Sequence, residues 1–342
     1  MRSAGLKSVN FTDIRILGIL IFIVVTAIIP LFTSDAFVYI LGLTYIFIIL
    51  AVSWDLIVGY TGQVNLGHTV FVGIGAYTTA LLQVPSRVQG TFLEFLSGMP
   101  QISIFTSILM GGVVAGTTGF LIGAITLRLR GWYFSLVTAV LPIVFIETTI
   151  IWRELFGGEE GFSIGLERAL APTSIGKYYI ALALMLVSIT IMFTIVNSKV
   201  GLKFKAVRED FYLAESIGVN PVNYKILAFV ISSFFAGVGG ALIVHYRSTV
   251  SPGLYDIPLM LLIILSAVIG GLGTIFGPVL GGLIVYLSKH WWLKGTIGIF
   301  TSLGLPLNDD IILYAILIVL AILVPEGLWM KAKKLVKHKP PF

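Results

Sequence analysis

Polar side chains in residues 59–77 are the groups best suited to chemistry in this apolar chain. The stretch reads GYTGQVNLGHTVFVGIGAY and places Gln63, Asn65, His68 and Phe71 at the start of an apolar run. Its glycines let the backbone leave helical geometry, which is tolerated at membrane depth only where protein buries it or a cavity adjoins it. A helix that starts there points free amide donors at an anionic group. The stretch predicts either the polar lining of a solute path, formed by these four residues, or an interfacial turn with a satisfied histidine.

Two ionisable residues, Asp55 and Glu147, lie within apolar segments. A charge inside a membrane span is costly and by default indicates a function, so proton coupling through these carboxyl groups is one hypothesis. The alternative is that both reach polar surroundings, because each lies within about one turn of the end of a predicted span.

Enzymatic chemistry has no motif in the sequence. The chain contains no GxxxxGK[ST] phosphate loop, no GxSxG and no HExxH, and its four histidines lie too far apart to suggest ligand spacing. It has no cysteine, so disulfides and thiolate metal sites are excluded. We therefore expect no catalytic residue, no cofactor and no metal, and we expect that the chain does not bind ATP itself.

The composition defines the class of protein. Hydrophobic residues make up 57% of the chain and charged residues 11%, with a mean hydropathy of +1.03, which excludes a soluble globule. The net charge of +6 comes from cations beside apolar segments and does not indicate a nucleic-acid partner.

Ten apolar segments predict an all-α polytopic membrane protein with about ten transmembrane helices. They are residues 14–32, 37–58, 66–84, 103–127, 132–152, 178–196, 224–246, 257–269, 276–287 and 310–324. The Gly-rich stretches near 59–65 and 270–276 could be re-entrant breaks, so a total of nine or eleven spans remains possible. The first segment is too long for the apolar part of a signal peptide, so we expect a retained helix.

Small residues recur every fourth position in the segment 103–127, at Gly111, Ala115, Gly119 and Gly123. In lipid, such a stripe lets another helix approach closely. Gly277 and Gly281 form a GxxxG pattern with the same meaning. We expect both patterns to serve packing.

The distribution of cations predicts the orientation. With both termini in the cytoplasm, fifteen Lys and Arg residues fall inside and seven outside, as the positive-inside rule requires. The predicted domains are a cytoplasmic leader (1–13), a single transmembrane domain (14–327) and a basic cytoplasmic tail (328–342).

Residues 199–223 form the most polar long segment, inside the transmembrane domain and on its cytoplasmic side. A loop that only sets orientation needs cations alone, yet this one also carries the apolar Phe211, Tyr212, Leu213 and Ile217, which favour a partner. The spacing predicts a short amphipathic helix over residues 208–217 that ends at Gly218, followed by a turn before Pro221.

Several motifs together resemble a known family. They are AVREDxxxAExxGVN at 206–220 followed by KxxAF, GxxxLGxxxFxxIGAY at 62–77, RLRGxYFxxVT at 128–138, FGGEEG at 156–161, GGxGTxxGP at 270–278 and PEGL at 325–328. In this order and spacing they resemble the membrane permeases of ABC importers for branched-chain amino acids, of the LivM type. Phe156 stands where the family commonly has Thr.

The resemblance implies a function and a set of partners. Residues 199–223 would be the cytoplasmic coupling loop, which docks on the ATP-binding subunit. The residues that couple the chain to that subunit would be Arg208, Glu209, Asp210, Ala214, Glu215 and Gly218. The partners would be a second homologous permease, two cytoplasmic ATP-binding subunits and an external solute-binding protein, in a prokaryotic inner membrane. The substrate would be a small molecule, a branched-chain or related amino acid. Permeases for urea or short amides remain the alternative, followed by a secondary transporter or a channel.

Overall fold

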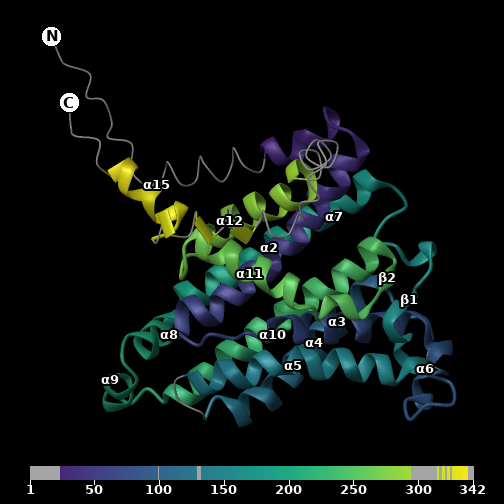
Figure 1. Ribbon diagram of the computed structural model, residues 1–342, viewed down its shortest axis with the longest axis horizontal. Helices are drawn as coiled ribbons and strands as arrows, with labels where there is room; N and C mark the ends of the chain where they lie inside the picture. Colours follow the sequence, from purple (N-terminus) through teal and green to yellow (C-terminus); the bar gives the residue numbers. More distant parts are fainter. Residues whose placement is uncertain are drawn as a thin grey trace.

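The computed structural model describes residues 24–98, 100–128, 132–293, 314–315, 318–319, 322–323 and 326–337, which form a bundle of apolar helices (Figure 1). The long helices are α2 (Asp35–Thr61), α3 (His68–Gln83), α4 (Ile104–Thr126), α5 (Trp132–Ile151), α7 (Ser174–Asn197), α10 (Pro221–Arg247), α11 (Ile257–Gly270) and α12 (Phe276–Leu287). The shorter helical elements are η1 (Ile29–Leu31), η2 (Pro85–Val88), η3 (Glu94–Leu96), α6 (Arg153–Phe156), η4 (Gly158–Glu160), η5 (Leu166–Arg168), α8 (Lys199–Glu209), α9 (Phe211–Ser216), η6 (Pro252–Leu254), η7 (Ser288–Leu293) and α15 (Leu328–Lys337). The strands are β1 (Phe162–Ser163) and β2 (Thr249–Val250).

Six helical segments among the described residues are long and apolar enough to cross a membrane: α2, α4, α5, α7, α10 and Pro252–Gly270. They confirm a helical, polytopic membrane protein. The last of these segments joins η6 to α11, which alone has 14 residues. Helices α3 and α12 have 16 and 12 residues and are shorter than the six. The total of ten stays a prediction, because the expected spans 14–32 and 310–324 lie largely outside the described residues; residues 24–28 of the first are helical.

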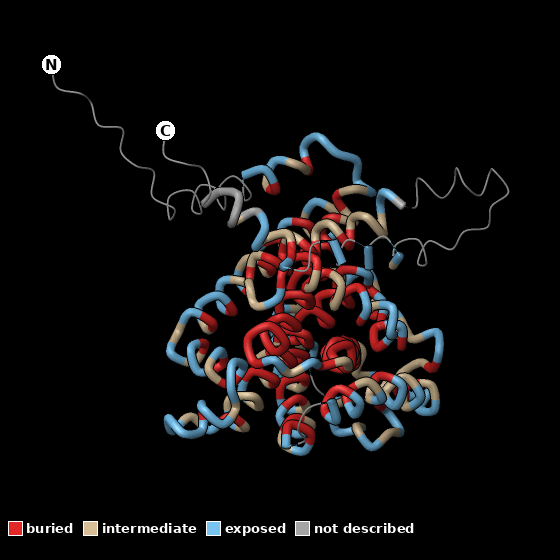
Figure 2. The backbone as a smooth tube through the Cα atoms, turned by 60° about the vertical axis from the view of Figure 1, so that its left-hand side comes forward, coloured by how far each residue is buried: buried red, intermediate tan, exposed pale blue. Residues whose placement is uncertain are grey.

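Helix α2 is the core of the bundle. Its residues are apolar on every side, and a helix of that kind is buried by its neighbours. It packs against α7, α10, α11 and α12. Figure 2 shows buried backbone gathered at the centre and exposed segments around it.

The stripe of small residues on α4 faces α10, as expected. A Cβ added at Gly119 would lie 2.5 Å from Ser233 Oγ of α10, and one added at Gly237 of α10 would lie 2.8 Å from the Gly111 carbonyl oxygen. The two helix backbones therefore approach as closely as glycine allows. Gly281 has the same role between α12 and α11, where an added Cβ would clash with the Ser266 carbonyl.

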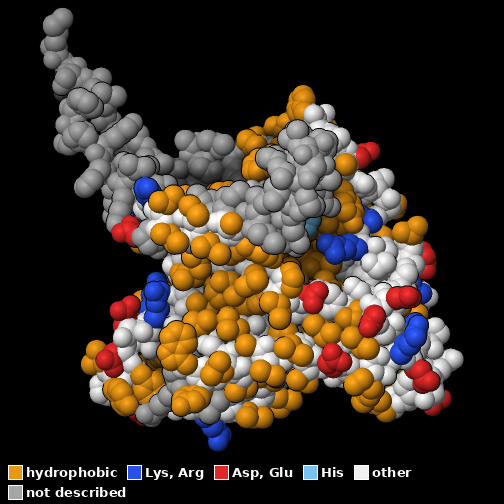
Figure 3. Space-filling view, in the orientation of Figure 1, with side chains coloured by type: hydrophobic (Ala, Val, Ile, Leu, Met, Phe, Trp, Pro, Cys, Tyr) orange, Lys and Arg blue, Asp and Glu red, His pale blue; other side chains and the backbone are white. Residues whose placement is uncertain are grey.

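The two ends of the bundle differ. At one end β1 pairs with β2 in antiparallel fashion, Phe162 opposite Val250, which joins the loop between α6 and α7 to the loop after α10. At the other end α8 and α9 project from the bundle (Figure 1). Apolar side chains dominate the face between these ends, and charged side chains gather nearer to them (Figure 3).

Candidate functional site

The chain leaves helical geometry between α2 and α3, as the glycine-rich sequence predicts. Gly62 ends α2 with a φ of 71°, in the left-handed region where glycine is at ease, and its amide donates to the Val58 carbonyl. Asn65 stabilises the turn, because its Oδ1 accepts a hydrogen bond of 2.9 Å from the Gly67 amide. Helix α3 then begins at His68.

Side chains from two helices satisfy the backbone of this break. The Trp54 indole of α2 donates to the Asn65 carbonyl at 2.7 Å. From α5, Thr138 Oγ1 accepts from the Leu66 amide at 3.1 Å, and Ser135 Oγ donates to the Val64 carbonyl at 2.8 Å. Irregular backbone inside a membrane needs such partners. Sequence reasoning missed all three side chains, because contacts between distant helices leave no local pattern.

The candidate path residues lie together around this break. Gln63 is half-buried, while Asn65, His68 and Phe71 are buried. His68 Nε2 lies 3.0 Å from Ser53 Oγ, and Phe71 packs edge-on against Phe229 with ring centroids 5.2 Å apart. Asn65 Nδ2 and His68 Nδ1 are buried without a hydrogen-bond partner. The cluster is closed in this conformation and retains unused hydrogen-bonding capacity.

The predicted helix over residues 208–217 is two helices. Helix α8 ends at Glu209, and Asp210 adopts extended geometry as the N-cap of α9, where its Oδ1 accepts from the Leu213 amide at 2.8 Å. Aspartate is among the best N-cap residues, which favours a new helix start at this position. A helix start inside the polar run was the signal that sequence reasoning overlooked.

The end of this segment follows the prediction. Gly218 has a φ of 81°, and the Val219 amide donates to the Ala214 carbonyl at 3.0 Å, which closes α9 with a left-handed glycine cap. Asn220 then caps α10 by accepting from the Asn223 amide at 3.2 Å. Pro221 stands in the first turn of α10, so this helix starts earlier than the predicted residue 224.

Helix α9 has an inner and an outer face. Ala214 is buried, as is Val207 of α8. Tyr212, Leu213 and Ile217 are 66%, 63% and 67% exposed. The acidic side chains of Glu209, Asp210 and Glu215 are exposed around them. An apolar patch with an acidic rim at the tip of a projection is typical of a docking surface.

Arg208 connects this projection to the transmembrane helices. Its guanidinium donates to the carbonyl of Gly59 in the last turn of α2. One turn earlier in α2, Asp55 Oδ1 accepts a 2.8 Å hydrogen bond from the Gly273 amide, in the turn between α11 and α12. A Cβ added at Gly59 would lie 2.3 Å from the Gly273 nitrogen. Arg208, the end of α2 and the α11–α12 turn thus form one contact cluster, the Arg208 junction.

The two intramembrane acids differ in their surroundings. Asp55 is fully buried and holds the α11–α12 turn, whereas Glu147 is exposed on α5. They share no contact in the described part of the chain.

Comparison with known proteins identifies the family of this chain. Residues 36–321 match the family described as branched-chain amino acid transport system, permease component. The chain belongs to this family.

Individual permeases of the family are recognisably similar. LivM of Escherichia coli, a high-affinity branched-chain amino acid transport system permease protein, is 28% identical over 292 residues, which cover 76% of this chain and 64% of LivM. LivH of Salmonella typhimurium is 24% identical, with 84% of this chain and 92% of LivH covered. BraD of Pseudomonas aeruginosa is 24% identical, with 72% and 81% covered. The chain therefore spans about 64% of the length of the LivM protein that it matches. No solved structure matches.

Proposed function

We propose that this protein is the transmembrane permease subunit of an ATP-driven ABC importer for branched-chain or related amino acids in a prokaryotic inner membrane. Its family supports the assignment, and so does the transport of branched-chain amino acids by its relatives LivM and LivH. The partners are a second homologous permease, two cytoplasmic ATP-binding subunits and an external solute-binding protein. ATP is bound and hydrolysed by the partner subunits, and the chain itself does no covalent chemistry.

We further propose ten spans with both termini in the cytoplasm. The cation distribution supports this orientation. The start of the tail contacts the same end of the bundle as the coupling segment: Trp329 packs on Phe276 with ring centroids 5.4 Å apart, and Gly327 lies against Gly271, two residues before Gly273 of the Arg208 junction. These contacts support the proposal that residues 199–223 and 328–337 lie on one side of the membrane, which the proposed orientation makes the cytoplasm.

The Arg208 junction is the observation that carries the mechanism. The α9 patch docks on an ATP-binding subunit, with Tyr212, Leu213 and Ile217 buried at the contact and the carboxylates of Glu209 and Glu215 at its rim. Asp210 and Gly218 fix the two ends of α9, and Ala214 seats it on the permease. When the ATP-binding subunits close, the force reaches α2 through Arg208.

The proposed solute path lies next to the end of α2 that Arg208 contacts. The Arg208 junction holds the last turn of α2, and the break at residues 62–67 follows directly. Gln63, Asn65, His68 and Phe71 form the inner closure of the path in this conformation. Movement of the α2 end opens this cluster and lets the unused donor of Asn65 Nδ2 and the unused acceptor of His68 Nδ1 meet solute or water.

Substitution of Arg208 tests the coupling. Arg208→Gln removes the charge and keeps amide donors. A hydrogen bond from a charged group contributes about 1.5–3 kcal/mol, so we expect solute-stimulated ATP hydrolysis to fall roughly 10- to 100-fold in proteoliposomes. Co-purification with the ATP-binding subunits is retained, because the α9 patch is untouched.

The matched control is Lys199→Gln, an exposed cation in the same helix away from the junction. It should leave stimulation unchanged. Normal stimulation in Arg208→Gln would refute transmission through the junction, and loss of co-purification would show that Arg208 belongs to the docking surface instead.

A further inference from the structure

Helix α15 (Leu328–Lys337) is a basic amphipathic helix that has no part in the α9 patch or in the proposed solute path. It reads LWMKAKKLVK, with four lysines and no acid in ten residues. At 3.6 residues per turn its apolar and its lysine positions fall on opposite sides. The apolar positions are 328, 329, 332, 335 and 336, and the lysine positions are 331, 333, 334 and 337. Such a pattern is typical of a helix that lies in the membrane interface.

The start of α15 is held among aromatic side chains at the edge of the bundle. Trp329 packs on Phe276 of α12 with ring centroids 5.4 Å apart, and Phe276 packs on Phe193 of α7 at 5.7 Å. Phe193 is exposed, and only 33% of the apolar stretch of α7 is buried, so this side of the bundle borders lipid. Tryptophan at the end of a span marks the level of the lipid headgroups. Helix α15 therefore leaves the bundle at that level, at the same end as α8 (Figure 1).

The charge of this segment suits an anionic lipid surface. Leu328 packs against the apolar core, whereas Lys331 is exposed. Residues 328–342 contain no acid that would neutralise the lysines from within the segment. A lysine at the surface of an anionic membrane strengthens attachment by a factor of about 5, and several act together. The groups that such a helix recognises are the phosphodiesters of anionic phospholipids.

The residue before α15 connects the helix to the Arg208 junction. Gly327 has a φ of 79°, and a Cβ added to it would clash with Gly271 Cα. Gly271 follows the end of α11, and two residues later the Gly273 amide donates to Asp55 Oδ1. The backbones of residues 327 and 271 are thus in direct contact, so a shift of α15 displaces the α11–α12 turn that Asp55 holds.

We propose that α15 is a binding site for the headgroups of anionic phospholipids, and that lipid bound there steadies the α11–α12 turn of the Arg208 junction. The lipid site stands apart from the transport assignment, whereas its effect on coupling rests on the proposed import function. A tail that only sets orientation needs its lysines during insertion and gives the inserted protein no preference among lipids.

A quenching experiment with the full-length chain tests the lipid site. Because the chain has no cysteine, Met330→Cys gives it a single thiol at an exposed position of α15. A fluorescent maleimide on this thiol, in phosphatidylcholine nanodiscs, is quenched by brominated lipid. We expect half-maximal quenching at a mole fraction of brominated phosphatidylglycerol at least about 5-fold lower than that of brominated phosphatidylcholine. In 1 M salt, where the Debye length is ~3 Å, the preference should be lost.

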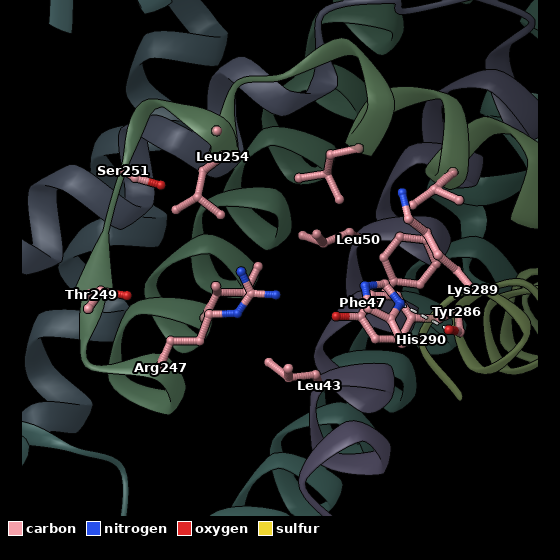
Figure 4. A pocket seen from close by; sticks show the side chains of 14 residues that line it. Leu43, Phe47, Leu50, Arg247, Thr249, Ser251, Leu254, Tyr286, Lys289 and His290 are labelled. Carbon is pink, nitrogen blue, oxygen red and sulfur yellow. Dashed lines mark hydrogen bonds between the residues drawn. The ribbon is translucent and has the colours of Figure 1, made fainter. Parts of the chain in front are cut away.

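Two sets of substitutions and a second reporter position isolate the lysines. Replacing them with Gln should abolish the preference, and replacing them with Arg should keep it, because Arg retains the charge. The four substitutions are made together, as Lys331→Gln, Lys333→Gln, Lys334→Gln and Lys337→Gln. The matched control is Thr249→Cys, exposed at the opposite end of the bundle beside a cavity of about 240 Å³ between α2, α10, α11 and α12 (Figure 4). Its label should respond alike with Lys, Gln or Arg in α15.

Two results would overturn the lipid site. One is equal quenching at residue 330 by the two brominated lipids, and the other is an unchanged preference in the Gln variant. Loss of co-purification with the ATP-binding subunits in the Gln variant, with quenching unaffected, would also overturn it, because the lysines would then dock on a subunit.

ATP hydrolysis by the assembled transporter tests the effect on coupling. Solute-stimulated hydrolysis should rise with the phosphatidylglycerol content of the nanodiscs, and this rise should be lost in the Gln variant and kept in the Arg variant. Gly327→Ala keeps the lysines but forces residue 327 away from Gly271, so the lipid preference should stay and the rise should disappear. Stimulation that does not vary with phosphatidylglycerol would overturn the effect on coupling. Hydrolysis that no branched-chain amino acid stimulates would refute the importer assignment instead, and the quenching at residue 330 is read independently of it.

Discussion

Gly218 offers a test of coupling in which the backbone alone is perturbed. Its φ of 81° is unfavourable for residues with a Cβ, and a Cβ added there would meet no atom within 4 Å. Gly218→Val therefore introduces no clash in this chain, and its cost is the ~1–2 kcal/mol of a left-handed conformation. Gly218→Asn is the control, because asparagine adopts this conformation more readily.

Because α9 is short, the free-energy cost of this substitution should lower the fraction of molecules in which α9 is ordered. A helix of six residues is not stable on its own, so it depends on the Asp210 cap at its start and the Gly218 cap at its end. A loss of 1–2 kcal/mol changes the ratio of ordered to disordered α9 by about 5- to 30-fold. We expect solute-stimulated ATP hydrolysis to fall by a similar factor in Gly218→Val and by much less in Gly218→Asn. Glu209→Lys, which reverses a charge at the rim, should also uncouple hydrolysis, but less than Gly218→Val.

The comparison of Gly218→Val with Gly218→Asn tests whether the backbone conformation of residue 218 is what matters. Equal damage by Val and Asn would mean that any side chain at residue 218 obstructs the ATP-binding subunit, and the conformational explanation would be wrong. Full activity of Gly218→Val would remove α9 from the coupling route altogether.

The remaining predictions concern orientation, the path and packing. A single cysteine at Glu160 should react with an impermeant thiol reagent from outside, and one at Lys203 only after permeabilisation; the reverse pattern would disprove the span count before residue 153. Asn65→Leu and His68→Leu should each lower the transport rate while assembly with the ATP-binding subunits is retained, and a normal rate would mean that this break is only a packed turn. Gly119→Leu forces α4 from α10, so we expect a lower thermal unfolding midpoint and less protein in the membrane, because overpacking costs about 1–3 kcal/mol or more; an unchanged midpoint would contradict the close approach.

The sequence predicts those features that depend on neighbouring residues. Hydropathy identifies α2, α4, α5, α7 and α10, because each helix carries its own apolar length. The stripe that includes Gly119 and the turn at residues 218–221 are likewise local patterns with one physical solution.

Features that depend on distant residues could not be predicted in this way. The Arg208 junction joins residues 55, 59, 208 and 273, and no periodicity links them. The cavity brings Leu43 together with His290, and the β1–β2 pair has two residues in each strand, too few for an alternating pattern. Asp210 shows a third limit: the same acidic residue suits an exposed helix position and an N-cap, and tertiary packing selects between them.

The central place of α2 has a consequence for biosynthesis. Helices α7, α10, α11 and α12, which pack against it, begin at Ser174 or later, and roughly 215 residues separate its end at Thr61 from the start of α12 at Phe276. At ~5–20 residues per second, the ribosome needs about 10–40 s to supply them. Newly inserted α2 therefore waits in the bilayer among lipid or insertion factors, and the Gly273 amide that binds Asp55 is made only near the end of this interval. A nascent chain stopped before residue 273 leaves the Asp55 carboxyl group without this donor.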